Sequence, residues 1–263
     1  MDILVCVKRV PDTSENEIEL NSAGTDIERG DLVYSVNEWD NYAVEEALQL
    51  AEKTDGNVTV VTVGNADDEE ILRREMAMGA KRSALVSDEA CKTSDRAGIA
   101  SLLTAFVQKN PHDLILTGVQ AEDGAAEVGG MMAAMLDYPF ASLVSAIEVV
   151  DGNKLMVSRE IEGGNKEVNE MELPCVLSIQ TGINEPRYVG MRGIRQVASV
   201  EIPTYDASQL GIDKARVGQS GSKVQRVNYF VPAPSKGAEI LGGSRQEIVD
   251  KMIELMKAKG GLQ

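Results

Sequence analysis

The sequence predicts an α/β fold: a doubly wound, mainly parallel sheet that forms a Rossmann-like nucleotide-binding domain. Two kinds of segment alternate in the first half of the chain. Apolar runs of strand length lie at 3–7, 57–63, 83–86 and 113–117, and helical patterns lie at 39–52, 67–78, 93–108 and 126–136. Such alternation is typical of βαβ units, in which right-handed crossovers place ligands at the carboxyl ends of parallel strands.

The spacing of apolar residues supports each helix in turn. Ala43, Ala47 and Leu48 recur at helical intervals in the first helix. The second opens with acidic residues, which a helix N-terminus favours, and closes at Gly79. The third places an apolar face around Phe106, and the fourth is rich in small residues.

After Pro139 the rhythm changes, because strand-like runs follow one another without helices. These runs lie at 144–150, 154–159, 166–172 and 175–179. The first two are joined by Asp151-Gly152-Asn153, which is a hairpin signal. We therefore expect an antiparallel extension of the same sheet rather than a new domain.

The part of the chain from 199 to 263 is expected to form a C-terminal arm that ends in a helix. Residues 199–243 are rich in Gly, Pro and Ser, and this stretch is too long for an ordinary loop. At 244–259, Ser244 and Glu247 form a capping-box pattern ahead of an apolar helical face. Two roles stay open for the arm, a clasp around a partner and a helix folded back on its own domain. The chain thus divides into an α/β domain at 1–198 and an arm at 199–263.

Composition excludes several classes of protein. The chain of 263 residues carries 26 Lys and Arg against 42 Asp and Glu, a net charge of −16, which disfavours binding along a nucleic acid. Its apolar runs are far shorter than the ~20 residues that span a bilayer, and residues 1–5 lack the basic region of a signal peptide. Three scattered cysteines form no disulfide framework, so we expect buried thiols and a cytoplasmic location.

No catalytic group or metal site is expected. His112 is the only histidine, and a lone histidine at a loop-to-strand junction is more often a surface residue than a catalyst. The chain has no GxSxG elbow, no His/Cys cluster, no P-loop and no GxGxxG after a strand.

The loop from Gly118 to Gly130 is the place where the sequence invites a ligand. It follows the strand at 113–117 and runs through a glycine-bearing stretch into a helix start. Backbone N–H groups there could hold the phosphate of a small nucleotide. A flexible turn whose small residues allow close helix packing explains the same pattern.

The segment from Ser158 to Ile194 has a distinctive sequence but contains no nucleophile–base pair and no metal-binding cluster. At its centre, Asn184-Glu185-Pro186-Arg187-Tyr188 predicts a rigid polar turn, because proline fixes one dihedral and pushes the preceding residue toward extended geometry. With Val157–Gly164 and Leu173-Pro174, this turn resembles the signature of the electron transfer flavoprotein beta subunit. The resemblance covers nearly the whole chain, including 7–10, 37, 43–47, 77–80 and 118–121.

The resemblance implies a heterodimer with a larger alpha subunit that carries most of the FAD site. It implies that acyl-CoA dehydrogenase-type donors grip a recognition loop at about 179–199, and that electrons pass to an acceptor such as a membrane quinone oxidoreductase. Met191 would be the apolar anchor, where the family has leucine, and Glu160 matches a glutamate that contacts the mobile flavin domain. The arm matches an extension around the alpha subunit. The partner-recognition residues so implied are Glu160, Ile183, Asn184, Glu185, Pro186, Arg187, Tyr188 and Met191.

The family also has a nucleotide cleft, which holds AMP in most members and a second FAD in electron-bifurcating members that react with NADH. The matching positions here are Cys6, Asn37, Glu38, Trp39, Asp40, Val63, Gly118, Gln120, Asp123, Gly124, Ala125, Ala126, Glu127 and Val128. The loop at 123–130 is one residue shorter than usual and lacks the usual threonine, and Glu127 would repel a phosphate unless it points away. Asp40 and Asp123-Gly124 favour the bifurcating type, whereas the short loop disfavours it. We favour AMP and keep a second FAD and an empty cleft open.

We consider three hypotheses for the function of the chain. The leading one is an electron-carrier subunit without a substrate-transforming site. The second is a bifurcating subunit that oxidises NADH at its own flavin. The third, of another class, is a stand-alone nucleotide-binding regulator or hydrolase, although a hydrolase would have only Asp123 and Glu127 as cleft acids and a regulator would not need the Asn184–Tyr188 turn or the arm.

Overall fold

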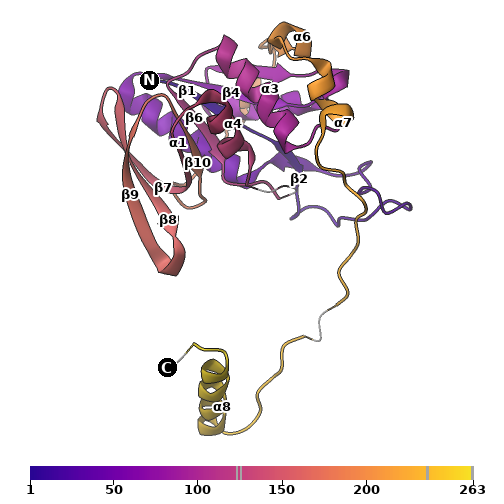
Figure 1. Ribbon diagram of the computed structural model, residues 1–263, viewed down its shortest axis with the longest axis vertical. Coiled ribbons are helices and arrows are strands. Elements are labelled where there is room, and N and C mark those ends of the chain that lie inside the picture. The colour runs from indigo at the N-terminus through magenta and orange to yellow at the C-terminus, as the bar shows by residue number, and fades with distance from the viewer. Residues whose placement is uncertain (123, 125, 235–236, 262–263) are drawn as a thin grey trace. The chain divides into compact units, whose positions relative to one another are not determined.

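A large, mostly parallel sheet forms the framework of the chain (Figure 1). The structure is a computed structural model that describes residues 1–122, 124, 126–234 and 237–261. Within these ranges the sheet has nine strands, in the order β11 (Thr204–Tyr205), β5 (Arg82–Val86), β4 (Asn57–Val63), β1 (Asp2–Cys6), β6 (Leu114–Gly118), β10 (Cys175–Ile179), β7 (Phe140–Asp151), β8 (Lys154–Ile161) and β9 (Asn165–Glu172).

The strand directions confirm the predicted fold class. All neighbours from β11 to β7 run parallel, and β8 and β9 continue the sheet in antiparallel fashion. The expected hairpin signal therefore joins β7 to β8, and the antiparallel piece extends the same sheet. A separate two-stranded sheet pairs β2 (Arg9–Pro11) with β3 (Tyr34–Val36).

Helices cover both faces of the sheet. Successive residues of a strand point to opposite sides, so apolar residues along a strand contribute to two buried clusters. Ile3 and Val5 of β1 belong to one buried cluster together with α1 (Glu38–Thr54) and α2 (Glu69–Met78). Leu4 of the same strand belongs to a second cluster with α3 (Arg96–Lys109) and α4 (Val128–Leu136). Asp40 in the first turn of α1 accepts from Gly118 at the end of β6, and Gly129 in α4 lies against Thr117 and Ser178. Both helices therefore begin near the carboxyl ends of the central strands.

The remaining elements are short turns and helices and one longer C-terminal helix. They are the 3-10 turns η1 (Ala66–Asp68), η2 (Glu89–Cys91), η3 (Glu162–Gly164) and η4 (Lys214–Arg216), and the helices α5 (Met191–Val197), α6 (Ala207–Leu210), α7 (Gly218–Gly221) and α8 (Arg245–Ala258).

The C-terminal part differs from the expected arm. The stretch at 204–221, expected to be arm, supplies β11 to the sheet edge and buries Ala207, Leu210 and Val217. The chain separates into two compact units, one of Met1–Glu19 with Glu28–Val227 and one of Leu20–Ile27 with Asn228–Gln263. The boundary between the two units therefore falls after Val227, and the last buried apolar side chain before it is Val217.

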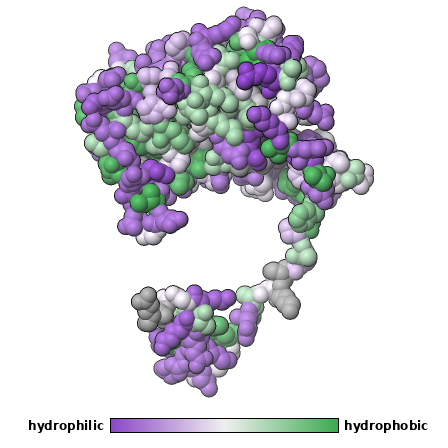
Figure 2. Space-filling model, viewed as in Figure 1, coloured by the Kyte–Doolittle hydropathy of each residue, from purple (hydrophilic) through white to green (hydrophobic). Residues whose placement is uncertain are grey.

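The second unit ends in the predicted helix. The Ser244 side chain accepts from the backbone N–H of Glu247, and the Glu247 carboxylate accepts from the backbone N–H of Ser244, which confirms the capping box. None of the residues of α8 is buried, so its apolar face at Met252 and Leu255 is uncovered in this chain. The side of α8 visible in Figure 2 is mostly hydrophilic. None of the helices described is both long and apolar enough to cross a membrane.

Candidate functional site

Asp40 ties together the carboxyl ends of β1 and β6. It lies in the first turn of α1, and its two carboxylate oxygens accept hydrogen bonds from the backbone N–H of Lys8 at 2.9 Å and of Gly118 at 3.0 Å. Burial raises the pKa of Asp40 to about 7, although hydrogen bonds from Asn37, Gly118 and Lys8 act in the opposite direction. The strand order reverses between β1 and β6, which is where open α/β sheets bind ligands.

Gly118 and Asn37 fix the beginning of the loop after β6. A Cβ atom on Gly118 would lie 2.4 Å from the Asp40 carboxylate and 2.6 Å from the Trp39 side chain, so this position needs glycine. The amide of Asn37 donates to the carbonyl of Gln120 at 2.8 Å. Five residues named from the sequence thus gather at one crevice, which we call the β1/β6 crevice.

The other predicted nucleotide-site residues spread around this crevice. Cys6 ends β1 opposite Thr117, and burial, with the charge of Asp40, raises the pKa of its thiol. Glu38 is exposed, and Val63 is half-buried at the end of the neighbouring strand β4. Two further predicted positions, Asp123 and Ala125, lie outside the described residues.

The loop then enters α4 at a close approach to the sheet. Gly129 is buried, and a Cβ atom there would lie 2.5 Å from the Ser178 hydroxyl and 2.8 Å from the Thr117 hydroxyl. Val128 starts the helix, and no side chain caps its first turn. The first N–H groups of a helix lack internal partners and favour anions. Both earlier explanations of this loop, close packing and phosphate binding, are thus compatible with the geometry.

Glu127 does not stand as an isolated negative charge. Its carboxylate lies 3.5 Å from the guanidinium of Arg96, the first residue of α3, and both side chains are partly exposed. Gly124, by contrast, is bridged to Ala121 within the loop, and Ala126 is exposed. The repulsion expected between Glu127 and a phosphate is therefore reduced by a neighbouring cation.

The residues present fit a small nucleotide. The uncapped start of α4 offers donors for a phosphate, and the buried Asn37 Oδ1 has no hydrogen-bond partner within the described part of the chain. An orphaned buried acceptor suits a donor from a bound base or sugar. The same donors would suit the phosphate of AMP or of a dinucleotide, so they do not separate these ligands.

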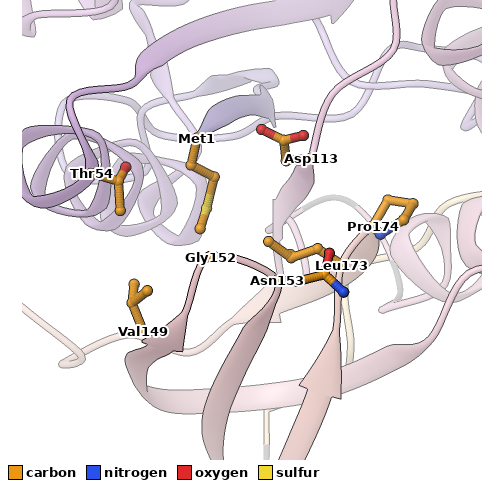
Figure 3. Close-up of a pocket in the computed structure, with 8 residues that line it drawn as sticks. All are labelled: Met1, Thr54, Asp113, Val149, Gly152, Asn153, Leu173 and Pro174. Carbon is orange, nitrogen blue, oxygen red and sulfur yellow. The ribbon is translucent and has the colours of Figure 1, made fainter.

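Two pockets lie away from this crevice. One, of about 310 Å³, is drawn in Figure 3 at the amino ends of the central strands, where Met1, Asp113 and Pro174 line it. Another, of about 220 Å³, contains His112, which is buried rather than at the surface and whose pKa is lowered by burial. All three cysteines are free and buried, as expected. The described residues contain no group of His, Cys, Asp and Glu able to hold a metal ion.

Arg187 attaches the rigid polar turn predicted at Asn184–Tyr188 to α1. Its guanidinium donates to both carboxylate oxygens of Glu45, at 2.8 and 3.0 Å, and to Glu52 at 2.8 Å, while its backbone N–H also donates to Glu45. Glu45 is almost completely buried. Burial tends to raise the pKa of Glu45, but the hydrogen bonds from Arg187 and Gln49 outweigh it and the pKa is lowered. A two-pronged, charge-assisted contact of this kind fixes geometry as well as adding energy.

Asn184 and Ile183 complete the attachment to α1. The Asn184 amide donates to the Tyr42 carbonyl at 3.1 Å and to the buried Glu46 carboxylate at 3.0 Å. Ile183 packs against the core cluster beneath. Glu185 faces solvent and Pro186 is half-buried.

Arg73 attaches the chain after this turn, at 197–200, to α2. One guanidinium nitrogen of Arg73 donates to the carbonyls of Val197, Ala198 and Val200, which lie at the end of α5 and just after it, and the other pairs with Glu69 at 2.9 Å. The last carbonyls of a helix lack internal partners, so a cation there is favourable. Residues 183–200 are therefore held at both ends; we call them the docking segment.

Between its two attachments, the docking segment presents apolar side chains to solvent. Tyr188 is 90% exposed, Met191 62% and Ile194 43%. Arg192 and Arg195 on the same short helix are also exposed. The predicted partner residues on this segment thus separate into two groups. One group is half-buried and the other is exposed; they are Ile183, Asn184, Pro186 and Arg187, and Glu185, Tyr188 and Met191. Glu160 lies elsewhere, exposed near the end of β8.

Several residues of the site escaped the sequence argument. Glu45, Glu46, Arg73 and Gln180 were not singled out, although one signal was available. Two acids in the middle of an apolar helix face must find partners when the face is buried, and Arg187 in the neighbouring polar turn was the obvious cation.

Comparison with known proteins agrees with this geometry. Residues 26–210 match the model of the electron transfer flavoprotein domain. The chain is 36% identical to the electron transfer flavoprotein subunit beta of Methylophilus methylotrophus, over 97% of this chain and 98% of that one. It is 34% identical to the caffeyl-CoA reductase-Etf complex subunit CarD of Acetobacterium woodii, over 98% and 99%, and 36% identical to protein FixA of Azotobacter vinelandii, over 92% and 88%. The chain belongs to the electron transfer flavoprotein family, as a beta subunit.

Proposed function

We propose that this chain is the docking and nucleotide-binding half of a heterodimeric electron carrier. Its partner is an alpha subunit that holds most of the FAD site, and FAD when bound there supplies the redox chemistry. Electrons come from acyl-CoA dehydrogenase-type flavoenzymes and leave to an acceptor such as a membrane quinone oxidoreductase. The buried free cysteines suit a reducing compartment, and we place the carrier in the cytoplasm.

One observation carries this proposal: the docking segment is rigidly held yet apolar at its tip. Arg187 and Arg73 fix its two ends on α1 and α2, and Met191 projects between them. A preorganised apolar anchor loses little conformational freedom on binding, which favours association with a partner. The exposed Arg192 and Arg195 on a chain of net charge −16 favour a partner whose pocket is rimmed by carboxylates.

Met191 gives the direct test of the docking role. Met191→Ala should lower the rate of electron transfer from a donor dehydrogenase through weaker binding, because the anchor loses most of its apolar surface. Met191→Leu is the matched control and should keep the rate, since the two side chains have similar volume. Flavin content should be the same in all three proteins. An unchanged rate in Met191→Ala, measured at subsaturating donor, would remove Met191 from the interface.

For the β1/β6 crevice we propose AMP as the ligand. The uncapped start of α4 and the orphaned acceptor of Asn37 support a nucleotide. The resemblance implies a loop at 123–130 that is one residue shorter than usual, which favours a ligand without a pyrophosphate. The role we propose for AMP is structural.

A second candidate is a bifurcating subunit with its own FAD. The likeness to a subunit of a caffeyl-CoA reductase-Etf complex and the acidic Asp40 at the crevice favour this alternative. Counting flavins in the purified heterodimer, by absorbance after denaturation, separates the two. One flavin with AMP released on denaturation supports the carrier; two flavins, with reduction by NADH, would replace it by the bifurcating subunit.

A further inference from the structure

Three polar side chains connect the β1/β6 crevice to the antiparallel part of the sheet. The indole N–H of Trp39 donates to Gln180 Oε1 at 3.2 Å, and Gln180 Nε2 donates to the carboxylate of Glu160 at 3.4 Å. Trp39 lies at the start of α1 beside Asp40, and Gln180 directly follows β10. The chain of hydrogen bonds therefore links α1, β10 and β8.

The direction of this chain is fixed by chemistry. The indole nitrogen can only donate a hydrogen bond, and so can the backbone N–H of Thr181, which also meets Gln180 Oε1 at 3.1 Å. Two donors at one atom require an oxygen there. The amide nitrogen of Gln180 must then face Glu160, so a carboxylate, which only accepts, is the matching partner.

Trp39 is also coupled mechanically to the crevice. Its Cβ and the Asp40 carboxylate are the atoms that a side chain at Gly118 would strike, so Trp39 packs directly on the end of β6. Asp40 in turn holds the backbone of Lys8 and Gly118. A change in the position of these strand ends, as a ligand in the crevice would cause, must therefore be felt at Trp39.

We propose that Gln180 is a positioning residue that couples occupancy of the β1/β6 crevice to the placement of the Glu160 carboxylate. The inference rests on the proposed function in two respects: the crevice binds a nucleotide, and Glu160 faces the flavin-bearing part of the alpha subunit. Coupling between two sites is reciprocal. Removing the charge of Glu160 must then alter nucleotide affinity, and it must do so through Gln180.

The test uses the purified heterodimer containing 5-fluorotryptophan. Trp39 is the single tryptophan of this chain, and its fluorine resonance is identified by its loss in Trp39→Phe. The resonance and the dissociation constant for AMP are measured in the parent protein, in Glu160→Gln, in Gln180→Met and in the double variant. We expect Glu160→Gln to move the resonance and to change the AMP constant by about two- to ten-fold, as one hydrogen bond would. In the Gln180→Met background both effects should vanish.

A second substitution separates the two links. Gln180→Glu can still accept from Trp39 but cannot donate to Glu160, so the AMP constant should change. Adding Glu160→Gln to this variant supplies an amide that can donate to the new carboxylate, so the constant should return toward the parent value. If Glu160→Gln moves neither readout, or moves them equally in both backgrounds, the coupling is refuted. If AMP does not bind the parent protein, the proposed ligand fails, and the resonance by itself still decides whether Gln180 transmits the change.

Discussion

Removing Arg187 should destabilise the docking segment and the first unit of the chain together. In Arg187→Met the Glu45 carboxylate, whose side chain is 4% exposed, keeps only the hydrogen bond from Gln49 at 2.9 Å. Stranding one partner of a fully buried ion pair costs ~3–5 kcal/mol. Since the Arg187 side chain is 35% exposed, water screens part of this pair, and we expect a loss of about 2–3 kcal/mol. For a unit of this size that lowers the melting temperature by roughly 4–12 °C.

A double-mutant cycle shows whether this loss belongs to the pair. Glu45→Gln removes the buried charge while Arg187 keeps Glu52, so the single variant should cost less, about 1 kcal/mol. The double variant should recover part of the loss, giving a coupling energy of about 1–2 kcal/mol. Arg192→Met, an exposed arginine of the same segment, is the control and should change stability by less than ~0.5 kcal/mol. All variants are compared in the same assembly and at the same concentration, because association shifts apparent stability.

The pH dependence gives an independent check of sign. The pKa of Glu45 is lower in the folded chain than in the unfolded one, so its contribution is fully present above the unfolded value of about 4.5 and is lost as pH falls through the folded value. The difference between the parent and Arg187→Met should therefore shrink below pH ~4. A cost under ~1 kcal/mol at pH 7, or strictly additive single variants, would refute the clamp.

Other substitutions test the crevice and the arm. Burial raises the pKa of Asp40 from its unfolded value to about 7, so the contribution of Asp40 to stability falls as pH rises between these two values. Urea unfolding at pH 5, 6.5 and 8 should therefore show that the parent protein loses stability relative to Asp40→Asn. Gly129→Ala should push the start of α4 from Thr117 and Ser178 and weaken AMP binding by at least ten-fold in calorimetry. Gly130→Ala is the milder control, because the nearest neighbour of its added Cβ would be the Phe140 ring at 3.4 Å. Ending the chain after Val227 should abolish stable association with the alpha subunit in gel filtration while leaving the melting of the first unit unchanged; unchanged association would leave the arm without a role.

Much of the framework could be predicted because it depends on local patterns. The β-branched runs, the helical spacing of Ala43 and Ala47 and the Ser244 capping box each specify their element without tertiary information. The short strand β11 escaped prediction because two residues carry no periodicity, and its pairing with β5 depends on backbone contacts far apart in the chain. Propensity in the Gly- and Pro-rich stretch was overridden by the burial of Leu210 and Val217.

The site was predicted in its parts but not in its connections. Asn37, Asp40 and Gly118 were named one by one. The two hydrogen bonds by which Asp40 joins Lys8 to Gly118 could be predicted only by knowing that β1 and β6 are neighbours. Glu127 was expected to repel a phosphate unless it points away, and its pairing with Arg96 was missed because the two residues lie far apart in the sequence. Long-range electrostatic partners are the information that a linear pattern lacks.

The position of β10 connects the β1/β6 crevice, the hydrogen bonds of Gln180 and the docking segment. This strand enters the sheet between β6 and β7, although the chain forms β7, β8 and β9 first. Ser178 near its end meets Thr117 at 2.9 Å beneath α4, the next-but-one residue Gln180 joins Trp39 to Glu160, and Asn184 a few residues later attaches the docking segment to α1. A displacement at the crevice would therefore reach the residues that attach the docking segment to α1. Because packed cores do not deform continuously, we expect ligand state and the geometry of the docking segment to change together, with β10 as the connecting element.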